Sequence, residues 1–182
     1  MNKILIVFFA LLVNNLNSEE NKINLYELYK ELHANPELSY QEIETSNKLA
    51  VILKNIGYEV TQNVGGNGVV ALLKNGEGKT VMLRADMDGL PVEEKTRADF
   101  ASKKKAIDPE GNEVFTMHAC GHDVHMSVLI GAAEFLFNNQ SLWQGNLLLV
   151  LEPAEEVSGG ARNMIKDGLF TRFPRPDYNL AL

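Results

Sequence analysis

Residues that can bind metal ions are concentrated in the segment MHACGHDVH, from Met117 to His125. The chain has four histidines and one cysteine in 182 residues. His118, His122, His125 and the single cysteine, Cys120, all lie in this segment. Imidazole and thiolate groups are good ligands for Zn, Mn, Co or Ni ions, so this composition favours a metal site. Cys120 and His122 are two residues apart, and an extended turn can point both side chains the same way.

Two apolar segments each lead into a pair of carboxylates. TVMLRADMD leads into Asp86 and Asp88, and LLLVLEPAEE leads into Glu155 and Glu156. Both segments are typical of buried strands, and sites in open α/β sheets lie outside the carboxyl ends of strands. We therefore expect both acidic pairs to face one end of the sheet, near the histidine-rich segment. Adjacent metal ions would let these acidic groups approach one another, because the ions dominate the local field.

Each of these features also has a simpler structural interpretation. Asp123 would cap the helix that follows it, and Cys120 alone would be a small core residue. Two neighbouring aspartates alone would form a turn, and two glutamates alone would be a solvated helix start. His118 and His125 would support packing. The sequence has neither a paired-cysteine zinc-finger spacing nor an HExxH motif, so the metal site depends on the convergence of all these groups.

Helices and strands alternate along the chain, which predicts an α/β layered fold. The expected elements are two helices between residues 23 and 57 separated at Pro36, a strand at 58–64, a hairpin around NGEG at 75–78, a loosely structured stretch at 89–115, a helix at 124–138 capped by Asp123, a buried strand at 145–153 and a helix at 160–167. The pattern contains no internal repeat.

The first residues differ from the rest of the chain. Lys3 precedes the apolar run ILIVFFALLV at residues 4–13, and the polar run NNLNSEE follows. A positive start and a short apolar core are typical of a secretory signal peptide. The run is shorter than the roughly 20 apolar residues that a membrane span needs. We predict a signal peptide at 1–18 and a secreted or periplasmic mature chain at 19–182; a buried N-terminal helix or strand is the alternative.

Composition and charge limit the class of protein. Hydrophobic residues make up 45% and charged residues 23% of the chain, as in a globular protein with a packed core. The net charge of −7 disfavours a nucleic-acid partner. In an oxidising compartment Cys120 has no second cysteine for an internal disulfide. It would therefore be a free core thiol, an intermolecular bridge, a metal ligand or a nucleophile.

Four motifs occur in order along the chain: ELHANPELSYQE, RADMDGLPVEE, HACGHDVHMSVLIGAA and LEPAEEVSGGARNMIKDG. Together they resemble the hippurate-hydrolase branch of the aminoacylase and carboxypeptidase G-like metallopeptidases, over residues 23–182. The resemblance implies a three-layer α/β catalytic domain with a mixed sheet, as in zinc peptidases. Residues 19–182 would be the N-terminal part of that domain. The smaller lid and dimerisation domain of the family has no counterpart here, and a homodimer is expected of the full-length protein.

The resemblance also implies metal-dependent hydrolysis of the amide bond of an N-acyl amino acid or a small peptide. Such enzymes use two divalent metal ions (Mn, Zn, Ni or Co) to activate a water molecule, and a glutamate to transfer its proton. By resemblance the metal ligands are Cys120, His122 and Glu156, with Cys120 at the bridging position. Glu155 matches the general base, and Asp88 matches the acid that orients a ligand.

The sequence departs from the family pattern after His125, because no histidine follows it. The family places two further metal histidines later in a longer chain, so we expect the reading frame to continue past Leu182 and this chain alone to be inactive. Asp86 stands where relatives outside this branch have a metal histidine, which leaves its role open. Two alternatives remain: a cysteine hydrolase that uses Cys120 as nucleophile, and a metal-binding fold without a complete site that is not an enzyme.

Overall fold

The structure is a computed structural model that describes residues 22–181. Its elements in chain order are helices α2 Leu25–Ala34 and α3 Ile43–Ile56, strands β1 Glu59–Val64, β2 Gly68–Asn75, β3 Thr80–Asp86, β4 Lys105–Ile107 and β5 Glu113–Phe115, helix α4 His122–Asn138, the short 3-10 helix η1 Gln140–Leu142, strand β6 Gly145–Glu152, helices α5 Gly160–Lys166 and α6 Leu169–Arg172, and strand β7 Tyr178–Ala181. The predicted signal peptide at 1–18 lies outside the described residues. Within residues 22–181, every helix is too short or too polar to cross a membrane.

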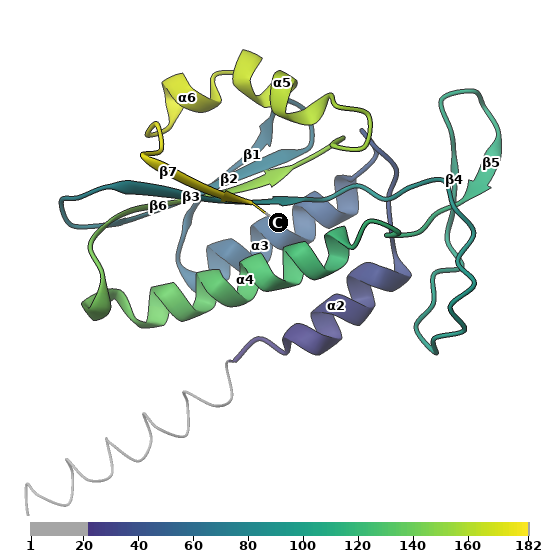
Figure 1. Cartoon of the computed structure of the whole chain (residues 1–182), viewed down its shortest axis with the longest axis horizontal. Helices are drawn as coiled ribbons and strands as arrows, with labels where there is room; N and C mark the ends of the chain where they lie inside the picture. Colours follow the sequence, from purple (N-terminus) through teal and green to yellow (C-terminus); the bar gives the residue numbers. More distant parts are fainter. Residues whose placement is uncertain (1–21, 182) are drawn as a thin grey trace, which may run out of the picture.

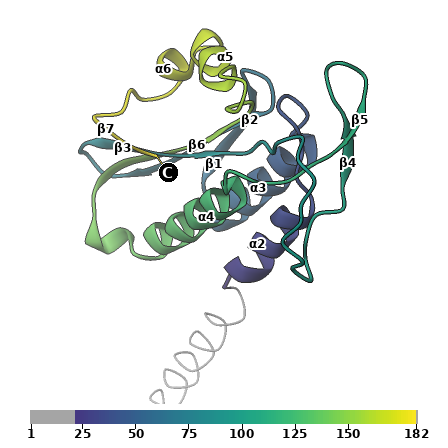
Figure 2. The same ribbon diagram turned by 45° about the vertical axis from the view of Figure 1, so that its right-hand side comes forward.

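A five-stranded mixed sheet with the order β1-β2-β6-β3-β7 forms the middle layer of the molecule (Figure 1). β6 is antiparallel to β2 and parallel to β3, and β3 is parallel to β7. Helices α3 and α4 cover one face of the sheet, and α5 and α6 lie over the other (Figures 1 and 2). This three-layer α/β arrangement with a mixed sheet confirms the predicted fold class.

The core is divided in two by the sheet. The larger cluster packs α2, α3 and α4 against one face and includes Leu49, Met126 and Leu149. The smaller cluster on the opposite face includes Leu148 and Met164. Leu148 and Leu149 are consecutive residues of β6 and point to opposite faces, as the twofold repeat of a strand requires. β6 is an unbroken apolar run because it is buried on both sides.

The predicted hairpin around NGEG is wrong. The chain does reverse there, but β2 and β3 do not pair, because β6 lies between them and pairs with both. A turn signal predicts a reversal of the chain and leaves the choice of partner strand open. The central position is taken by β6, whose residues Leu147–Glu152 are all buried, as in a strand covered on both faces.

Two further expectations are corrected near the segment that carries the histidines. The stretch at 89–115 contains the two-stranded hairpin of β4 and β5, which extends from the body of the molecule (Figure 2). Helix α4 begins at His122 rather than Val124, and its N-cap is Gly121 with a φ of 81°. Asp123 is therefore not the cap but lies in the first turn of α4, and its Oδ2 is hydrogen-bonded to His33 of α2.

Candidate metal centre

The carboxyl ends of β3 and β6 lie level with each other and bring the two acidic pairs together. Asp86, the last residue of β3, is in register with Glu152, the last residue of β6. The chain then continues from β3 to Asp88 and from β6 to Glu155 and Glu156. The backbone amides of both glutamates donate to the Asp88 carboxylate. The expectation that both acidic pairs face one end of the sheet is confirmed.

Asp88 joins four segments of the chain at this end of the sheet. Its side chain is buried; Oδ1 accepts from the Glu155 amide at 3.1 Å, and Oδ2 accepts from the Glu156 amide at 3.1 Å and from Ser39 Oγ at 2.6 Å. Its main-chain oxygen accepts from His122 Nδ1 at 2.8 Å. Burial raises the pKa of Asp88, but hydrogen bonds from His122, Ser39 and the two amides outweigh burial and lower it below its ordinary value. Asp88 is therefore an anion at neutral pH.

The imidazole of His122 points its other nitrogen at three carboxylates. Nε2 lies 3.8 Å from Glu155 Oε2, 3.9 Å from Glu156 Oε1 and 3.9 Å from Asp86 Oδ2. Burial lowers the pKa of His122, but its hydrogen bonds to Asp88 and the charge of Asp86 raise it to about 9. The acidic surroundings thus attract positive charge to the space beside Nε2.

The donor atoms in this space fit a divalent metal ion. One ligand atom from each of His122, Glu155 and Glu156 lies within 4.8 Å of the others. Glu156 Oε1 is buried and has no hydrogen-bond partner, and a buried carboxylate oxygen without a partner is costly unless a cation satisfies it. Imidazole nitrogen and carboxylate oxygen bind zinc and related ions at about 2.0–2.2 Å, so one ion can be shared by groups 3.8–3.9 Å apart.

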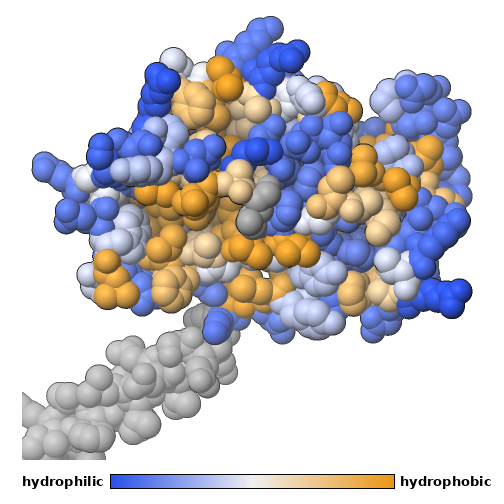
Figure 3. All heavy atoms as spheres, viewed as in Figure 1, coloured by the Kyte–Doolittle hydropathy of each residue, from blue (hydrophilic) through white to orange (hydrophobic). Residues whose placement is uncertain are grey.

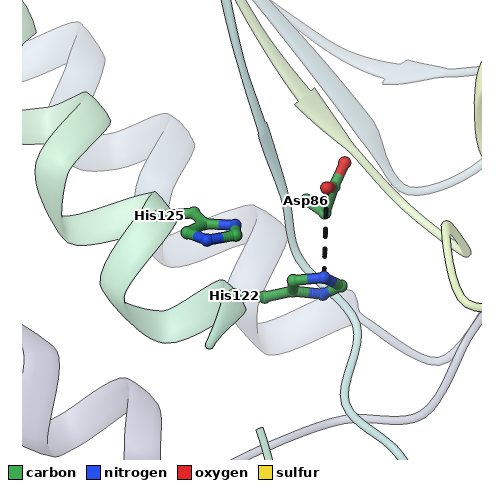
Figure 4. A group of neighbouring side chains, drawn as sticks. All are labelled: Asp86, His122 and His125. Carbon is green, nitrogen blue, oxygen red and sulfur yellow. Dashed lines mark ion pairs between the residues drawn. The ribbon is translucent and has the colours of Figure 1, made fainter. Parts of the chain in front are cut away.

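A second group of possible ligands consists of Asp86, His122 and His125 (Figure 4). His125 lies one turn along α4, and its ring centroid is 5.6 Å from that of His122. Its Nδ1 is buried and has no partner. Asp86, however, also accepts from Arg84 Nε at 2.9 Å, and Arg84 Nε is 2.7 Å from Glu152 Oε2. Arg84 therefore offsets part of the negative charge at Asp86.

Cys120 lies beside this group but outside it. Its side chain is exposed, and neither group of possible ligands found within residues 22–181 includes it. A hydrogen bond with Glu156, together with partial burial and the charges of Glu156 and Glu155, raises the pKa of the thiol to about 11. The structure therefore brings Cys120 next to one predicted ligand, Glu156, and its own role as a ligand stays a prediction. His118 is buried, and burial lowers its pKa to about 4.

Sequence reasoning missed Glu42, which shapes the loop that carries the glutamates. Glu42 is fully buried; Oε1 accepts from the amides of Ala154 at 2.7 Å and Tyr40 at 2.9 Å, and Oε2 accepts from Asn67 Nδ2 at 3.0 Å. Ala154 has a φ of 50°, a conformation that non-glycine residues seldom adopt. Glu42 stabilises this strained residue directly before Glu155. The one sequence feature that could have indicated Glu42 is its position as the last residue of the motif ELHANPELSYQE.

Known proteins are similar to this chain in sequence and in fold. The sequence pattern of peptidase family M20/M25/M40 matches residues 82–182. The thermostable carboxypeptidase 2 of Saccharolobus solfataricus is 42% identical over 164 residues, which are 87% of this chain and 39% of that protein. The hippurate hydrolase of Campylobacter jejuni is 44% identical over 144 residues, 79% of this chain and 35% of that protein.

A solved structure agrees with this grouping. The dinuclear metal-binding peptidase of the M20 family from Bacillus subtilis matches with a TM-score of 0.71 and 35% identity, over 80% of this chain and 38% of that chain. The three-layer fold and the carboxylate- and imidazole-rich centre agree with this family of peptidases. The chain belongs to peptidase family M20/M25/M40, and the resemblance inferred from its motifs is confirmed. It spans 39% and 35% of the lengths of the two curated relatives.

Proposed function

We propose that the protein is a metal-dependent hydrolase that cleaves the amide bond of an N-acyl amino acid or a small peptide. The observation that carries this proposal is the convergence of His122, Glu155 and Glu156 beside the buried Asp88. Relatives named hippurate hydrolase and carboxypeptidase support this substrate class. Thiolate, imidazole and carboxylate donors support Zn, Mn, Co or Ni as the two bound ions.

The residues at the centre divide the chemistry among them. Bound divalent ions would supply electrophilic assistance to the scissile carbonyl and to a water molecule. His122, Glu156 and Cys120 would hold the ions. Because His122 Nδ1 donates to the Asp88 carbonyl, Nε2 is the nitrogen that faces the carboxylates. Glu155 would accept the proton from water and pass it to the leaving amine.

The exposures of the two glutamates support this division. The Glu155 side chain is 39% exposed, whereas that of Glu156 is 16% exposed and has the buried oxygen without a partner. A general base must reach both water and substrate, which suits the more exposed Glu155. A ligand must give its oxygen to an ion, which suits Glu156.

The two alternatives are less well supported. Reactive cysteines lie in electropositive surroundings that stabilise the thiolate, whereas Cys120 lies beside Glu155 and Glu156. A metal-binding fold that is not an enzyme would take up ions without turnover.

The apolar run at residues 4–13 supports export of the protein to a periplasmic or extracellular location, and the family resemblance supports a homodimer of the full-length protein.

The proposal is tested with Glu155→Gln and Glu156→Gln in the full-length protein. Metal content is measured by mass spectrometry and turnover on hippurate. Glu155→Gln should keep its metal and lose about 100- to 10,000-fold in rate, as expected for loss of a general base. Glu156→Gln should lose metal. Glu93→Gln is the matched control, because Glu93 is an exposed carboxylate that pairs with the exposed Lys95.

Two outcomes would contradict the proposal. Ordinary turnover by Glu155→Gln would show that this residue is not the base. Metal loss in Glu155→Gln but not in Glu156→Gln would reverse the assignment.

Cys120→Ala and His122→Ala should each lower the metal content and abolish turnover. An unchanged metal content in both would give the cysteine–histidine segment another purpose.

A further inference from the structure

The imidazole of His33 lies between two carboxylates that are not themselves predicted ligands, those of Asp123 and Glu94. His33 is in the last turn of α2 and is buried. Its Nδ1 is 2.6 Å from Asp123 Oδ2, and its Nε2 is 3.0 Å from Glu94 Oε1. The ring also packs against Tyr29 and Phe100, with centroid separations of 5.6 Å and 5.2 Å. A polar group is thus enclosed by apolar walls and has a carboxylate at each ring nitrogen.

The chemistry of the three groups determines the protonation state. An ionised carboxylate only accepts hydrogen bonds, and a neutral imidazole has a single N–H. Two donated hydrogen bonds therefore require the imidazolium form of His33. Burial lowers the pKa of His33, but the hydrogen bonds to Glu94 and Asp123 outweigh burial and raise it. Charge-assisted hydrogen bonds of this kind are roughly twice as strong as neutral ones.

This imidazolium joins three segments that are distant in sequence. Asp123 is in the first turn of α4, and Glu94 is in the segment between β3 and β4. The second oxygen of each carboxylate is also used: Asp123 Oδ1 accepts from the Val124 amide at 2.9 Å, and Glu94 Oε2 accepts from the Ser102 amide at 2.5 Å. His33 thus holds the end of α2, the start of α4 and the segment after Asp88 in one arrangement.

The start of α4 depends on this contact, because its N-cap residue, Gly121, has no side chain with which to cap the helix. Successive residues of a helix point about 100° apart around its axis. His122 therefore faces Asp88, while Asp123 faces α2 and His33. The two hydrogen bonds fix the first turn of α4 from two directions. Cys120 and Gly121 precede this turn directly, so their position follows from it.

We propose that His33, as an imidazolium held by Asp123 and Glu94, is a positioning residue that fixes the Cys120–His122 turn for metal binding. The metal-binding half of this inference rests on the proposed function. Without the imidazolium, two buried carboxylates would lose their shared partner, and such groups are costly to leave unpaired. The first turn of α4 would then shift or loosen. Loss of a residue that orients metal ligands typically lowers metal affinity by about 10- to 100-fold.

The first experiment tests the arrangement without metal. Nitrogen NMR of the full-length protein should show two N–H groups on His33 at neutral pH. Amide hydrogen exchange at residues 118–124 should be faster in His33→Gln than in the unsubstituted protein. Tyr29→Leu is the matched control, because it removes a wall of the same ring and leaves both hydrogen bonds. Detection of one ring N–H, or equal exchange in His33→Gln and the unsubstituted protein, would overturn the proposal whether or not metal binds.

The second experiment measures zinc affinity by calorimetry. His33→Gln should bind zinc about 10- to 100-fold more weakly, and Tyr29→Leu should bind it as the unsubstituted protein does. The double variant H33Q/E94Q removes one of the two unpaired charges, so it should recover part of the lost affinity. Folded His33→Gln with unchanged zinc affinity, or no recovery in the double variant, would overturn the positioning role. If the unsubstituted protein binds none of Zn, Mn, Co or Ni, the proposed function fails, and the exchange and NMR results still decide whether His33 fixes the turn.

Discussion

Among single residues, Asp88 connects several segments at the candidate centre. It accepts three hydrogen bonds through its carboxylate and one through its main-chain oxygen. All four donors come from other segments, so a change at Asp88 affects the positions of Glu155, Glu156 and His122 together. The sequence predicted that Asp88 orients a ligand, but it gave no sign that the same carboxylate holds the loop of the glutamates.

Asp88→Asn should weaken the fold even without metal. The amide group of asparagine has one oxygen in place of two, so its NH2 would face a donor that Asp88 now accepts from. One buried donor without a partner costs about 1–3 kcal/mol. Urea unfolding of the metal-free protein should show a loss of that order. Asp99→Asn, at an exposed carboxylate in the same connection, should change the unfolding free energy by less. Equal stability of both variants would show that Asp88 does not hold the loop.

His33 predicts a pH dependence of stability. Its pKa is raised above the ordinary value of 6.5, so its protonation stabilises the folded state fully below about 6.5 and this contribution is lost as pH rises through the folded pKa. The groups that face it are Asp123 and Glu94, with Tyr29 and His118 nearby. The difference in unfolding free energy between the unsubstituted protein and His33→Gln should therefore shrink from neutral to alkaline pH. A difference that is constant over this range would contradict the prediction.

At the scale of elements, periodicity predicted most of what positions the centre. α2, α3, α4, β6 and α5 lie close to their expected ranges because each has a long apolar pattern or a buried run. The short elements β4, β5 and α6 were not predicted, since three or four residues carry too little pattern. Asp123 was wrongly predicted as the N-cap of α4, because a carboxylate near the start of an apolar helix suits an N-cap as well as it suits the first turn. The contact with His33 is 90 residues away in sequence and leaves no local signal.

The register of β3 and β6 depends on a glycine. Gly145 begins β6 with a φ of 113°, and a Cβ there would lie 2.3 Å from the main-chain oxygen of Lys79. Lys79 directly precedes β3, so the close approach sets how the two strands start beside each other. A change in register at this end of the two strands would also displace their other end, where Asp86 lies opposite Glu152.

Gly145→Ala should therefore lower stability more than a glycine change in open space. Positive φ alone costs a non-glycine residue about 1–3 kcal/mol, and Gly145→Ala adds a clash with backbone. Gly76→Ala is the matched control, because Gly76 has a φ of 79° but no atom within 4 Å of the added Cβ. Thermal unfolding should rank Gly145→Ala below Gly76→Ala. The reverse order, or equal stability, would show that the strands accommodate the methyl group without loss.

For the whole molecule, the alternation of elements predicted the layers and the end of the sheet where the site lies. The carboxyl ends of buried strands are a general location for sites, so the two acidic pairs could be placed from sequence. The exact groups around His122 could not, because they depend on rotamers and on the strand order, in which β6 lies between β2 and β3. Within residues 22–181, the same sheet order leaves β7 as an outer strand that pairs with β3.

Apolar side chains gather on the face that carries β7 and α4 (Figure 3). Tyr178 and Leu180 of β7 are 62% and 59% exposed, and Val128 and Phe135 of α4 are 49% and 61% exposed. A strand with one open edge beside exposed apolar groups favours association with another polypeptide. We therefore expect the 182-residue chain to self-associate through this face at high protein concentration.

Leu180→Lys places a charge on the outer strand and should shift the chain toward monomer, because charged residues on edge strands oppose strand pairing. Sedimentation velocity over a range of protein concentrations measures the shift. Tyr26→Lys is the matched control, since Tyr26 is 60% exposed on α2, an element that takes no part in the sheet. Circular dichroism of each variant confirms that the fold is retained. If Leu180→Lys and Tyr26→Lys change association equally, or if the unsubstituted chain is monomeric throughout, the open edge of β7 is not an association surface.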